Sequence, residues 1–338
     1  MARRSLWSRL LLAVLGLMLI GAAGLTTAIW LWLDRPLPLA GASAELSIEA
    51  GATPRDVAQA WVDAGVQTQP RLLFEWFRWS GQARRIRAGS YEIDAGTSPR
   101  GLLAKMVQGE ETLERVRFIE GWTLRQVRVA LAKAPHLKPA TAQLSDAQLM
   151  AALGTPDLPA EGRFFPDTYV YSRGVSDLTV LRRAHQALQQ RLAEVWAERT
   201  PDSPLRTPDD LLTLASIVEK ETGLAADRGL VAGVFVNRLR IGMPLQTDPT
   251  VIYGLGATFD GNLRKRDLLT DGPYNTYTRG GLPPTPIALP GLASLRAAVR
   301  PQPTKALYFV ARGDGSSVFS ETLADHNRAV NKYQRGGS

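Results

Sequence analysis

The sequence predicts a mixed α+β fold behind one N-terminal transmembrane helix. Three observations support this class. A run of 24 residues, 10–33, contains no charged side chain. A strand–turn–helix pattern then recurs within residues 48–127. Beyond it lie two amphipathic helical patterns and a final pair of short strands, so helices and strands both contribute to the part outside the membrane.

The uncharged run is long enough to cross a bilayer, because 24 helical residues extend roughly 36 Å. Basic residues before it and tryptophans near its far end fit a membrane anchor. These are Arg3, Arg4, Arg9, Trp30 and Trp32. We therefore expect a cytoplasmic tail (1–9), a transmembrane helix (10–33) and a periplasmic remainder. A cleaved signal peptide is the competing interpretation, but the run exceeds the usual signal core of about 7–15 residues.

The repeated unit begins at Ile48–Val57 and recurs at Ile93–Leu102 and, more loosely, at Ile119–Val127. Each copy combines a strand end, a glycine turn, a Ser or Thr suited to cap a helix, and an amphipathic segment. The pattern predicts a small α+β module within residues 34–112. A ligand-binding module and a spacer between membrane and active site are both compatible with it.

Two glutamates stand at the end of a predicted helix that Thr207 caps and Pro208 begins. Gly223 is placed to end this helix. At about 100° per residue, its apolar side chains share one face and Lys220 lies nearly opposite. The apolar residues are Leu211, Leu214, Ala215, Ile217 and Val218. Glu219 and Glu221 therefore flank the apolar face and border the core.

A carboxyl group in this position can act as a general acid. The last helical turn carries partial negative charge, and partial burial disfavours an ionised carboxylate, so both effects raise the pKa of such a group. A glutamate that stays protonated near neutral pH can donate its proton to a glycosidic oxygen. The competing interpretation is a solvated helix end, for which Glu and Lys are ordinary residues.

Several further motifs follow in a fixed order. They are Val234–Leu239, Leu245–Gly254, Tyr274–Tyr277, Gly281–Ile287 and His326–Asn327, with Glu161–Gly162 and Phe165–Tyr169 upstream. Together with the two glutamates, this series closely resembles the endolytic murein transglycosylases of the MltG (YceG-like) family. The resemblance runs from the membrane anchor to about residue 335.

The resemblance implies a small LysM-like α+β module at 34–112 and a lysozyme-like YceG α+β catalytic domain at 113–338. Within that domain we expect a helical part at 113–200 and a catalytic core at 205–335. In related lytic transglycosylases, Ser or Thr follows the catalytic glutamate. Glu221 precedes Thr222, whereas Glu219 precedes Lys220, so Glu221 is the expected catalytic acid and Glu219 the second choice.

The implied reaction is a non-hydrolytic cleavage of the MurNAc–GlcNAc β-1,4 bond within glycan strands. It would leave 1,6-anhydro-MurNAc ends and limit or terminate nascent strands. No cofactor is expected. Two alternatives remain open at this stage. One is a hydrolase of the same glycan, a muramidase, with Asp248 or Glu219 as second carboxylate. The other is a non-catalytic glycan-binding scaffold of the wall-synthesis machinery.

Polar and aromatic side chains around the acid are the expected substrate-binding residues. They are Gln246, Thr247, Asp248, Tyr274, Asn275 and Tyr277. Asp248 has an alternative role as an Asx turn or a helix start. Tyr253 and Tyr277 have an alternative role as core aromatics. The proline-rich stretch Gly281–Pro286 is interpreted as a groove wall.

Composition restricts the partners. The chain has no cysteine, so no disulfide supports it. Its three histidines show no metal-ligand spacing, and no metal site is expected. The net charge of +8 is spread along the chain without a basic stripe, which argues against nucleic acid and favours peptidoglycan strands and the inner membrane surface. The anchor would also bring the chain near peptidoglycan synthases.

The remaining segments give coarser predictions. Residues 146–198 are expected to be mainly helical, with Phe165–Tyr169 as a packed turn. A second helix is predicted at Leu230–Leu239, followed by a loop-rich region. Ala306–Ala311 and Ser317–Phe319 are predicted to pair across a glycine turn.

Overall fold

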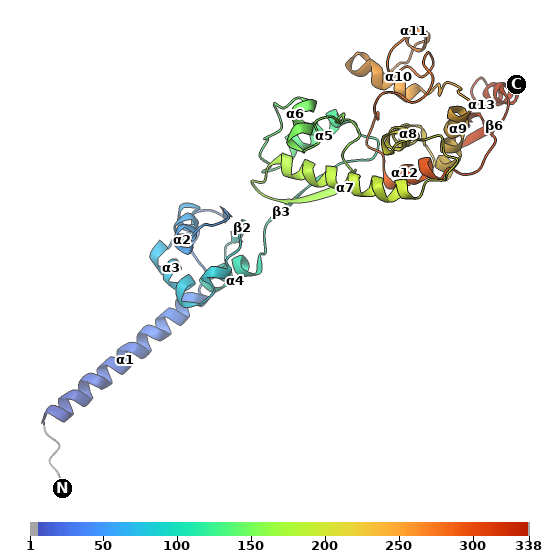
Figure 1. Cartoon of the computed structure of the whole chain (residues 1–338). Coiled ribbons are helices and arrows are strands. Elements are labelled where there is room, and N and C mark those ends of the chain that lie inside the picture. Colours follow the sequence, from blue (N-terminus) through green and yellow to red (C-terminus); the bar gives the residue numbers. More distant parts are fainter. Residues whose placement is uncertain (1–5, 337–338) are drawn as a thin grey trace. The chain divides into compact units, whose positions relative to one another are not determined.

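The computed structural model describes residues 6–336, and its chain folds into two compact units (Figure 1). Unit 1 contains the residues up to Glu114 together with Tyr171–Gly174, and unit 2 contains the rest. Arg3 and Arg4 of the expected cytoplasmic tail lie outside the described residues. The mixed α+β class is confirmed.

Unit 1 begins with the long apolar helix α1, of which residues 10–34 have the length and composition of a membrane span. Two strands, one before and one after helices α2 and α3 in the sequence, pair antiparallel, with Ser43 opposite Asp94 and Ile48 opposite Gly89. The elements are α1 (Leu6–Asp34), β1 (Ser43–Ile48), α2 (Pro54–Asp63), α3 (Pro70–Trp79), η1 (Ala83–Arg85), β2 (Gly89–Asp94) and α4 (Pro99–Gln108). Buried Trp61, Phe77 and Tyr91 fill their core.

The strand–turn–helix repeat is confirmed in all three copies. Thr53 and Ser98 accept hydrogen bonds from the first turns of α2 and α4, and Thr123 forms a capping box with Gln126 at α5 (Leu124–Lys133). The preceding strands are β1, β2 and β3 (Leu113–Arg117), respectively. A hydroxyl before each helix binds amide groups that the helix itself leaves unpaired, which is why the pattern can be recognised in the sequence.

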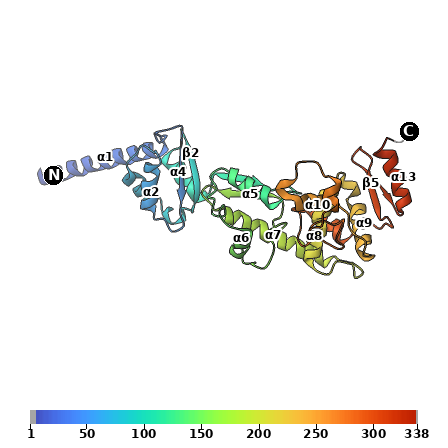
Figure 2. The same cartoon turned by 90° about the horizontal axis from the view of Figure 1, so that it is seen from above.

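Unit 2 is mainly helical, and a strand pair precedes its last helix. Its elements after α5 are α6 (Asp146–Ala152), β4 (Thr168–Ser172), α7 (Asp177–Ala197), α8 (Pro208–Glu221), η2 (Ala225–Asp227), α9 (Arg228–Arg240), α10 (Asp248–Leu255), η3 (Gly256–Thr258), α11 (Lys265–Leu269), α12 (Leu292–Val299), β5 (Tyr308–Ala311), β6 (Ser317–Ser320) and α13 (Leu323–Tyr333). β5 and β6 pair antiparallel, as predicted, and α13 packs on them (Figure 2).

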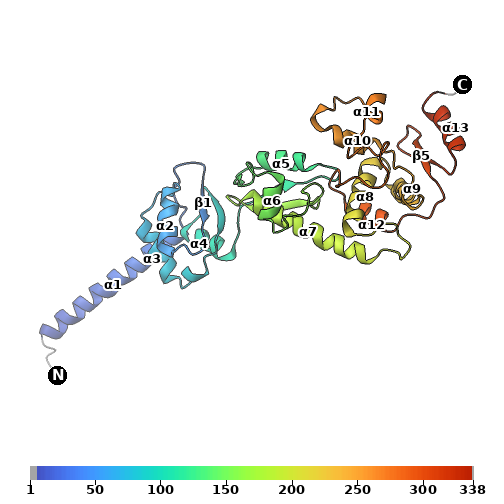
Figure 3. The same cartoon turned by 45° about the horizontal axis from the view of Figure 1, so that its top comes forward.

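Helix α8 lies at the centre of unit 2, in contact with α7, α9, α10 and α12 (Figure 3). All residues from Leu211 to Val218 are buried, so the helix is covered on every side and not along one stripe alone. The predicted cap is confirmed, because Thr207 and Asp210 form a capping box. The helix ends at Glu221, two residues before Gly223, and Thr222 takes the cap position.

Two coarse sequence predictions are confirmed, but they left out several elements. Residues 146–198 are mainly helical, with α6 and α7, and also contain the strand β4, which pairs with β3. The region after Gly242 is loop-rich and also contains the helices α10, α11 and α12. The pairing partner of β4 lies about fifty residues earlier in the chain, and α10, α11 and α12 each have at most eight residues. Isolated helices this short are unstable and depend on tertiary contacts, which local sequence patterns do not reveal.

Gly162 lies in a left-handed conformation, with φ of 76°, against the loop that carries Pro286. A Cβ at this position would stand 2.4 Å from the Pro286 Cβ. We expect Gly162→Ala to lower the free energy of unfolding by roughly 1–3 kcal/mol, measured by urea denaturation of the full chain in detergent. Gly154→Ala is the matched control, since Gly154 also has positive φ but has open space around its Cα. Equal losses in the two variants would contradict the steric explanation.

Candidate functional site

Glu221 is half-buried at the C-terminal end of α8 and faces the loop that begins α10. The Thr247 hydroxyl donates a short hydrogen bond to the Glu221 Oε1 atom. Asp248 is close enough for its negative charge to act on Glu221. The side chain is therefore bordered by the predicted 246–248 segment instead of open solvent.

The pKa of Glu221 is raised above its ordinary value. Burial is the main cause, because a carboxylate loses hydration there. The hydrogen bond from Thr247 lowers the pKa, the charge of Asp248 raises it, and the charge of Arg238 lowers it. A carboxyl group that retains its proton toward neutral pH can serve as a general acid.

Glu219 has a different environment, although it also lies in the last turn of α8. Its Oε2 atom accepts hydrogen bonds from the Gly291 N–H at 3.0 Å and the Ser294 hydroxyl at 2.7 Å. Gly291 is the N-cap of α12, where unpaired amide groups stabilise a carboxylate. Glu219 thus joins the end of α8 to the start of α12, and this contact distinguishes it from Glu221.

The segment Gln246–Asp248 is fixed by its backbone. The Gln246 N–H donates to the Thr276 carbonyl at 3.0 Å, and the Thr247 N–H donates to the Thr276 hydroxyl at 3.0 Å. Thr247 is buried, whereas Gln246 and Asp248 are exposed. Asp248 starts helix α10, so the helix-start interpretation of Thr-Asp-Pro-Thr is confirmed. Its exposed carboxylate still faces the site.

In the segment Tyr274–Tyr277, Tyr277 contacts Asp248 of the site, whereas Asn275 stabilises the surrounding loop. The Tyr277 hydroxyl donates to Asp248 Oδ1 at 2.5 Å, which places Tyr277 beside the acid. Tyr274 packs edge-on against Tyr253, with ring centroids 4.8 Å apart. Asn275 is buried, and its amide donates to the carbonyls of Asp267, Leu268 and Thr270. The amide of Asn275 therefore holds the loop together, and its predicted contact with substrate stays a prediction.

Arg238 was not predicted as a site residue, although the sequence motif around it was noted. Its buried guanidinium donates to the carbonyls of Leu307, Pro244 and Leu245, the last at 2.8 Å. The residue thereby anchors the loop that leads into Thr247. The position of Arg238 among the apolar residues of α9 could have indicated this role, because a cation that is buried there needs hydrogen-bond acceptors around it.

A cleft of about 710 Å³ lies in unit 2 between the start of α5, the end of α8 and helix α10. Glu161 lines it and accepts hydrogen bonds from the Leu124 and Gly162 N–H groups and from the Tyr253 hydroxyl. Burial raises the pKa of Glu161 to about 7. Lys220 and Pro249, the sequence neighbours of Glu221 and Asp248, also line this cleft, whereas Glu221 and Asp248 are not among its lining residues. The position of Glu161 in this cleft and its raised pKa were not predicted from the sequence.

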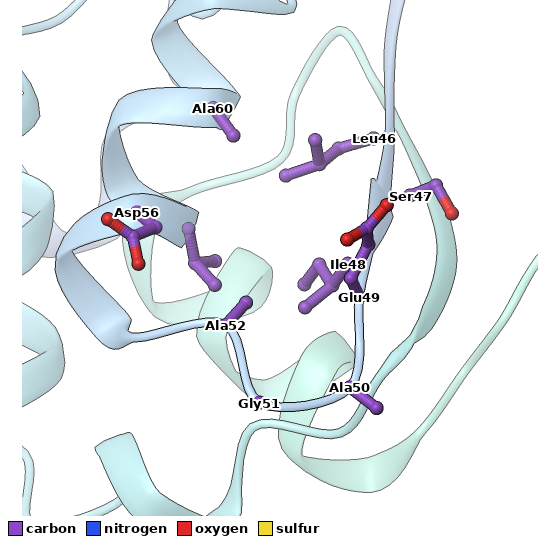
Figure 4. A pocket seen from close by; sticks show the side chains of 10 residues that line it. Leu46, Ser47, Ile48, Glu49, Ala50, Gly51, Ala52, Asp56 and Ala60 are labelled. Carbon is purple, nitrogen blue, oxygen red and sulfur yellow. The ribbon is translucent and has the colours of Figure 1, made fainter.

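A second hollow, of about 390 Å³, lies in unit 1 at the turn between β1 and α2. Leu46 and Ala60 point toward one another across it from the strand and the helix (Figure 4). Its carboxylates are Glu49 and Asp56, and Asp56 also forms the capping box of α2 with Thr53. The capping bonds are the main cause that lowers the pKa of Asp56.

Comparison with known proteins agrees with this architecture. The model of the YceG-like family matches residues 46–332. A Bacillus subtilis protein named endolytic murein transglycosylase is 32% identical over 305 residues, covering 85% of this chain and 84% of its own length. A Streptococcus pneumoniae protein of the same name is 27% identical over 89% of this chain, which spans 61% of that longer protein.

A solved structure of a putative YceG-like protein from Listeria monocytogenes is also similar to this chain. Its sequence is 28% identical, and the match covers 85% of this chain and 98% of that one with a TM-score of 0.54. Family model, curated relative and solved structure thus agree over most of the chain. The protein belongs to the YceG-like family.

Proposed function

We propose that this protein is a membrane-anchored endolytic murein transglycosylase with Glu221 as its catalytic acid and base. The observation that carries the assignment is the environment of Glu221, which is half-buried and hydrogen-bonded to Thr247 beside Asp248. The names of its relatives supply the substrate class, peptidoglycan glycan strands. Glu219, the second choice, is engaged at the start of α12, which supports Glu221 over it.

The proposed chemistry needs only one carboxyl group. Protonated Glu221 donates its proton to the glycosidic oxygen between MurNAc and GlcNAc as the bond to the anomeric carbon breaks. The resulting carboxylate then removes the proton from the C6 hydroxyl of the same MurNAc, whose oxygen attacks the anomeric carbon. The product is a 1,6-anhydro-MurNAc end, and Glu221 regains its proton. The attacking hydroxyl is already held next to the reacting carbon, so no second carboxylate is required.

The surrounding residues have proposed supporting roles. Thr247 and Asp248 set the protonation of Glu221, and Tyr277 orients Asp248 through its 2.5 Å hydrogen bond. Tyr274 presents a half-buried ring for a sugar face, while exposed Gln246 offers an amide to N-acetyl or hydroxyl groups. Asn275 keeps the loop that carries both tyrosines in shape.

We further propose that α1 anchors the chain in the inner membrane, with the N-terminus in the cytoplasm and the enzyme in the periplasm. The apolar span of 25 residues and the arginines that precede it in the sequence support this orientation. In that position the enzyme could act on strands as synthases of the same membrane produce them, and so limit nascent strand length.

We also propose that the module at 34–112 is LysM-like and binds glycan. Its support is a separate core around Trp61 and a hollow at the β1–α2 turn, whose volume lies in the range of small-ligand pockets (Figure 4).

Product analysis tests the proposed reaction. The full chain in detergent is incubated with purified, uncross-linked murein strands, and the new ends are identified by mass spectrometry. We expect internal cleavage with 1,6-anhydro-MurNAc ends. Reducing MurNAc ends that carry an added water would reject the transglycosylase in favour of a muramidase that uses Asp248 as second carboxylate. Strands that are bound but left intact would indicate a scaffold.

A further inference from the structure

The cleft beside α10 carries positive charge that no acidic residue balances. Arg125, in the first turn of α5, and Lys220, near the end of α8, both line the cleft and are exposed. Within residues 6–336, neither side chain forms an ion pair, and Lys220 donates only a long hydrogen bond of 3.4 Å to the Gly121 carbonyl. Two cations from separate helices therefore face one cavity without counter-ions.

The acidic residues of the cleft are already engaged. Asp146 pairs with Arg128 at 2.9 Å, so these two charges offset one another. Both oxygens of Glu161 accept hydrogen bonds from groups on the cleft wall. The raised pKa of Glu161, about 7, also reduces its negative charge near neutral pH. The cleft consequently favours a ligand that brings its own carboxylates.

Much of the remaining cleft wall is apolar, apart from the hydroxyl groups of Thr123 and Tyr253. Ile252, Phe259 and Pro249 line it from α10 and the segment that follows. Small methyl groups would fit against these side chains, while a carboxylate could reach the two cations. A glycan strand without peptides offers only one carboxylate on each MurNAc, that of its lactyl group. In peptidoglycan this lactyl group carries a short, alanine-containing peptide, whose free carboxylates can pair with both cations.

We propose that this cleft binds the acidic peptide stem of a MurNAc residue next to the cleaved bond, with Arg125 and Lys220 pairing with stem carboxylates. The proposal rests on the proposed transglycosylase function and deepens it by adding the stem to the recognised substrate. The cleft and the proposed catalytic acid share two elements, because Lys220 and Pro249 line the cleft and stand next to Glu221 at the end of α8 and to Asp248 at the start of α10. The enzyme would thus select strands that retain their stems.

The test compares two substrates with the full chain in detergent. One is a set of uncross-linked murein strands with intact stems, and the other is the same strands after an amidase has removed the stems, which leaves a single free lactyl carboxylate on each MurNAc. We expect kcat/KM to be about three- to tenfold higher for strands with stems, the scale of one to two partly exposed ion pairs. The preference should weaken as salt concentration rises, because exposed charges are screened.

Paired variants assign the effect to the cleft. In Arg125→Gln/Lys220→Gln the ratio of the two kcat/KM values should fall toward one. Lys133→Gln/Arg206→Gln removes the same charge from exposed positions that do not line the cleft, and should keep the wild-type ratio. Equal cleavage of both substrates by the wild type would overturn the proposal, as would a cleft variant that retains the full preference.

Failure of the underlying function gives a different result. If the wild type releases no anhydro ends from either substrate, the transglycosylase assignment fails and the stem proposal fails with it. If anhydro ends appear at the same rate from both, only the stem proposal is lost.

Discussion

Replacement of Glu221 by glutamine should reduce murein cleavage by roughly 10²–10⁴-fold, because glutamine can neither donate nor accept the transferred proton. We expect the upper part of this range, since the same carboxyl group acts in both halves of the proposed reaction. Glutamine has the shape of glutamate and can still accept a hydrogen bond from Thr247, so the fold should persist. The rate of release of anhydro ends from purified strands measures the effect, and circular dichroism verifies folding.

Glu219→Gln is the matched control. Glu219 lies two residues away on the same helix, but its Oε2 atom binds Gly291 and Ser294 at the start of α12. Loss of the carboxylate should lower the free energy of unfolding by roughly 1–3 kcal/mol and leave most of the cleavage rate in the folded protein. A folded Glu219→Gln variant without activity, beside an active Glu221→Gln variant, would move the catalytic role to Glu219.

The sequence predicted the positions of these two glutamates, but it did not predict the difference between their environments. The cap at Thr207, the buried face of α8 and the position of both carboxyl groups beside the core follow from local rules of helix formation, and the structure confirms them. The difference between the two residues depends on Gly291 and Ser294, more than seventy residues later. In the sequence, only the resemblance to the family favoured Glu221.

The same distinction explains Arg238 and Glu161, whose roles were not predicted. Arg238 acts on the site by binding the carbonyl groups of Leu245 and Leu307, and burial raises the pKa of Glu161 although its hydrogen bonds from Leu124 and Tyr253 lower it. Each role arises from contacts between segments far apart in the chain. Helix α12 was missed for a related reason, because its first turn is stabilised by Glu219 from another helix. Local periodicity cannot report such contacts.

Asp248→Asn should shift the alkaline limb of the kcat/KM profile to lower pH. Glu221 must hold a proton in the free enzyme, so activity falls as the pH rises through its pKa. Burial is the main cause that raises this pKa, and the negative charge of Asp248 raises it further. Asparagine removes that charge, and the pKa of Glu221 falls. Above the shifted limb, the rate should fall about tenfold for each pH unit.

The Tyr277→Phe variant tests whether the charge of Asp248 or its hydrogen bond with Tyr277 controls the pKa of Glu221. The variant loses the 2.5 Å bond from the Tyr277 hydroxyl but keeps the Asp248 carboxylate. Its alkaline limb should therefore stay at the wild-type pH or move above it, since an unshared negative charge favours protonated Glu221 at least as strongly. Initial rates of release of anhydro ends, measured across the pH range, give the alkaline limb of the kcat/KM profile for the wild type and for both variants.

The prediction for Asp248→Asn fails if its alkaline limb coincides with that of the wild type. In that case, either Asp248 does not change the pKa of Glu221 or Glu221 is not the group that titrates. The Glu221→Gln rate decides between these two explanations, because a variant that still cleaves at the wild-type rate identifies the second.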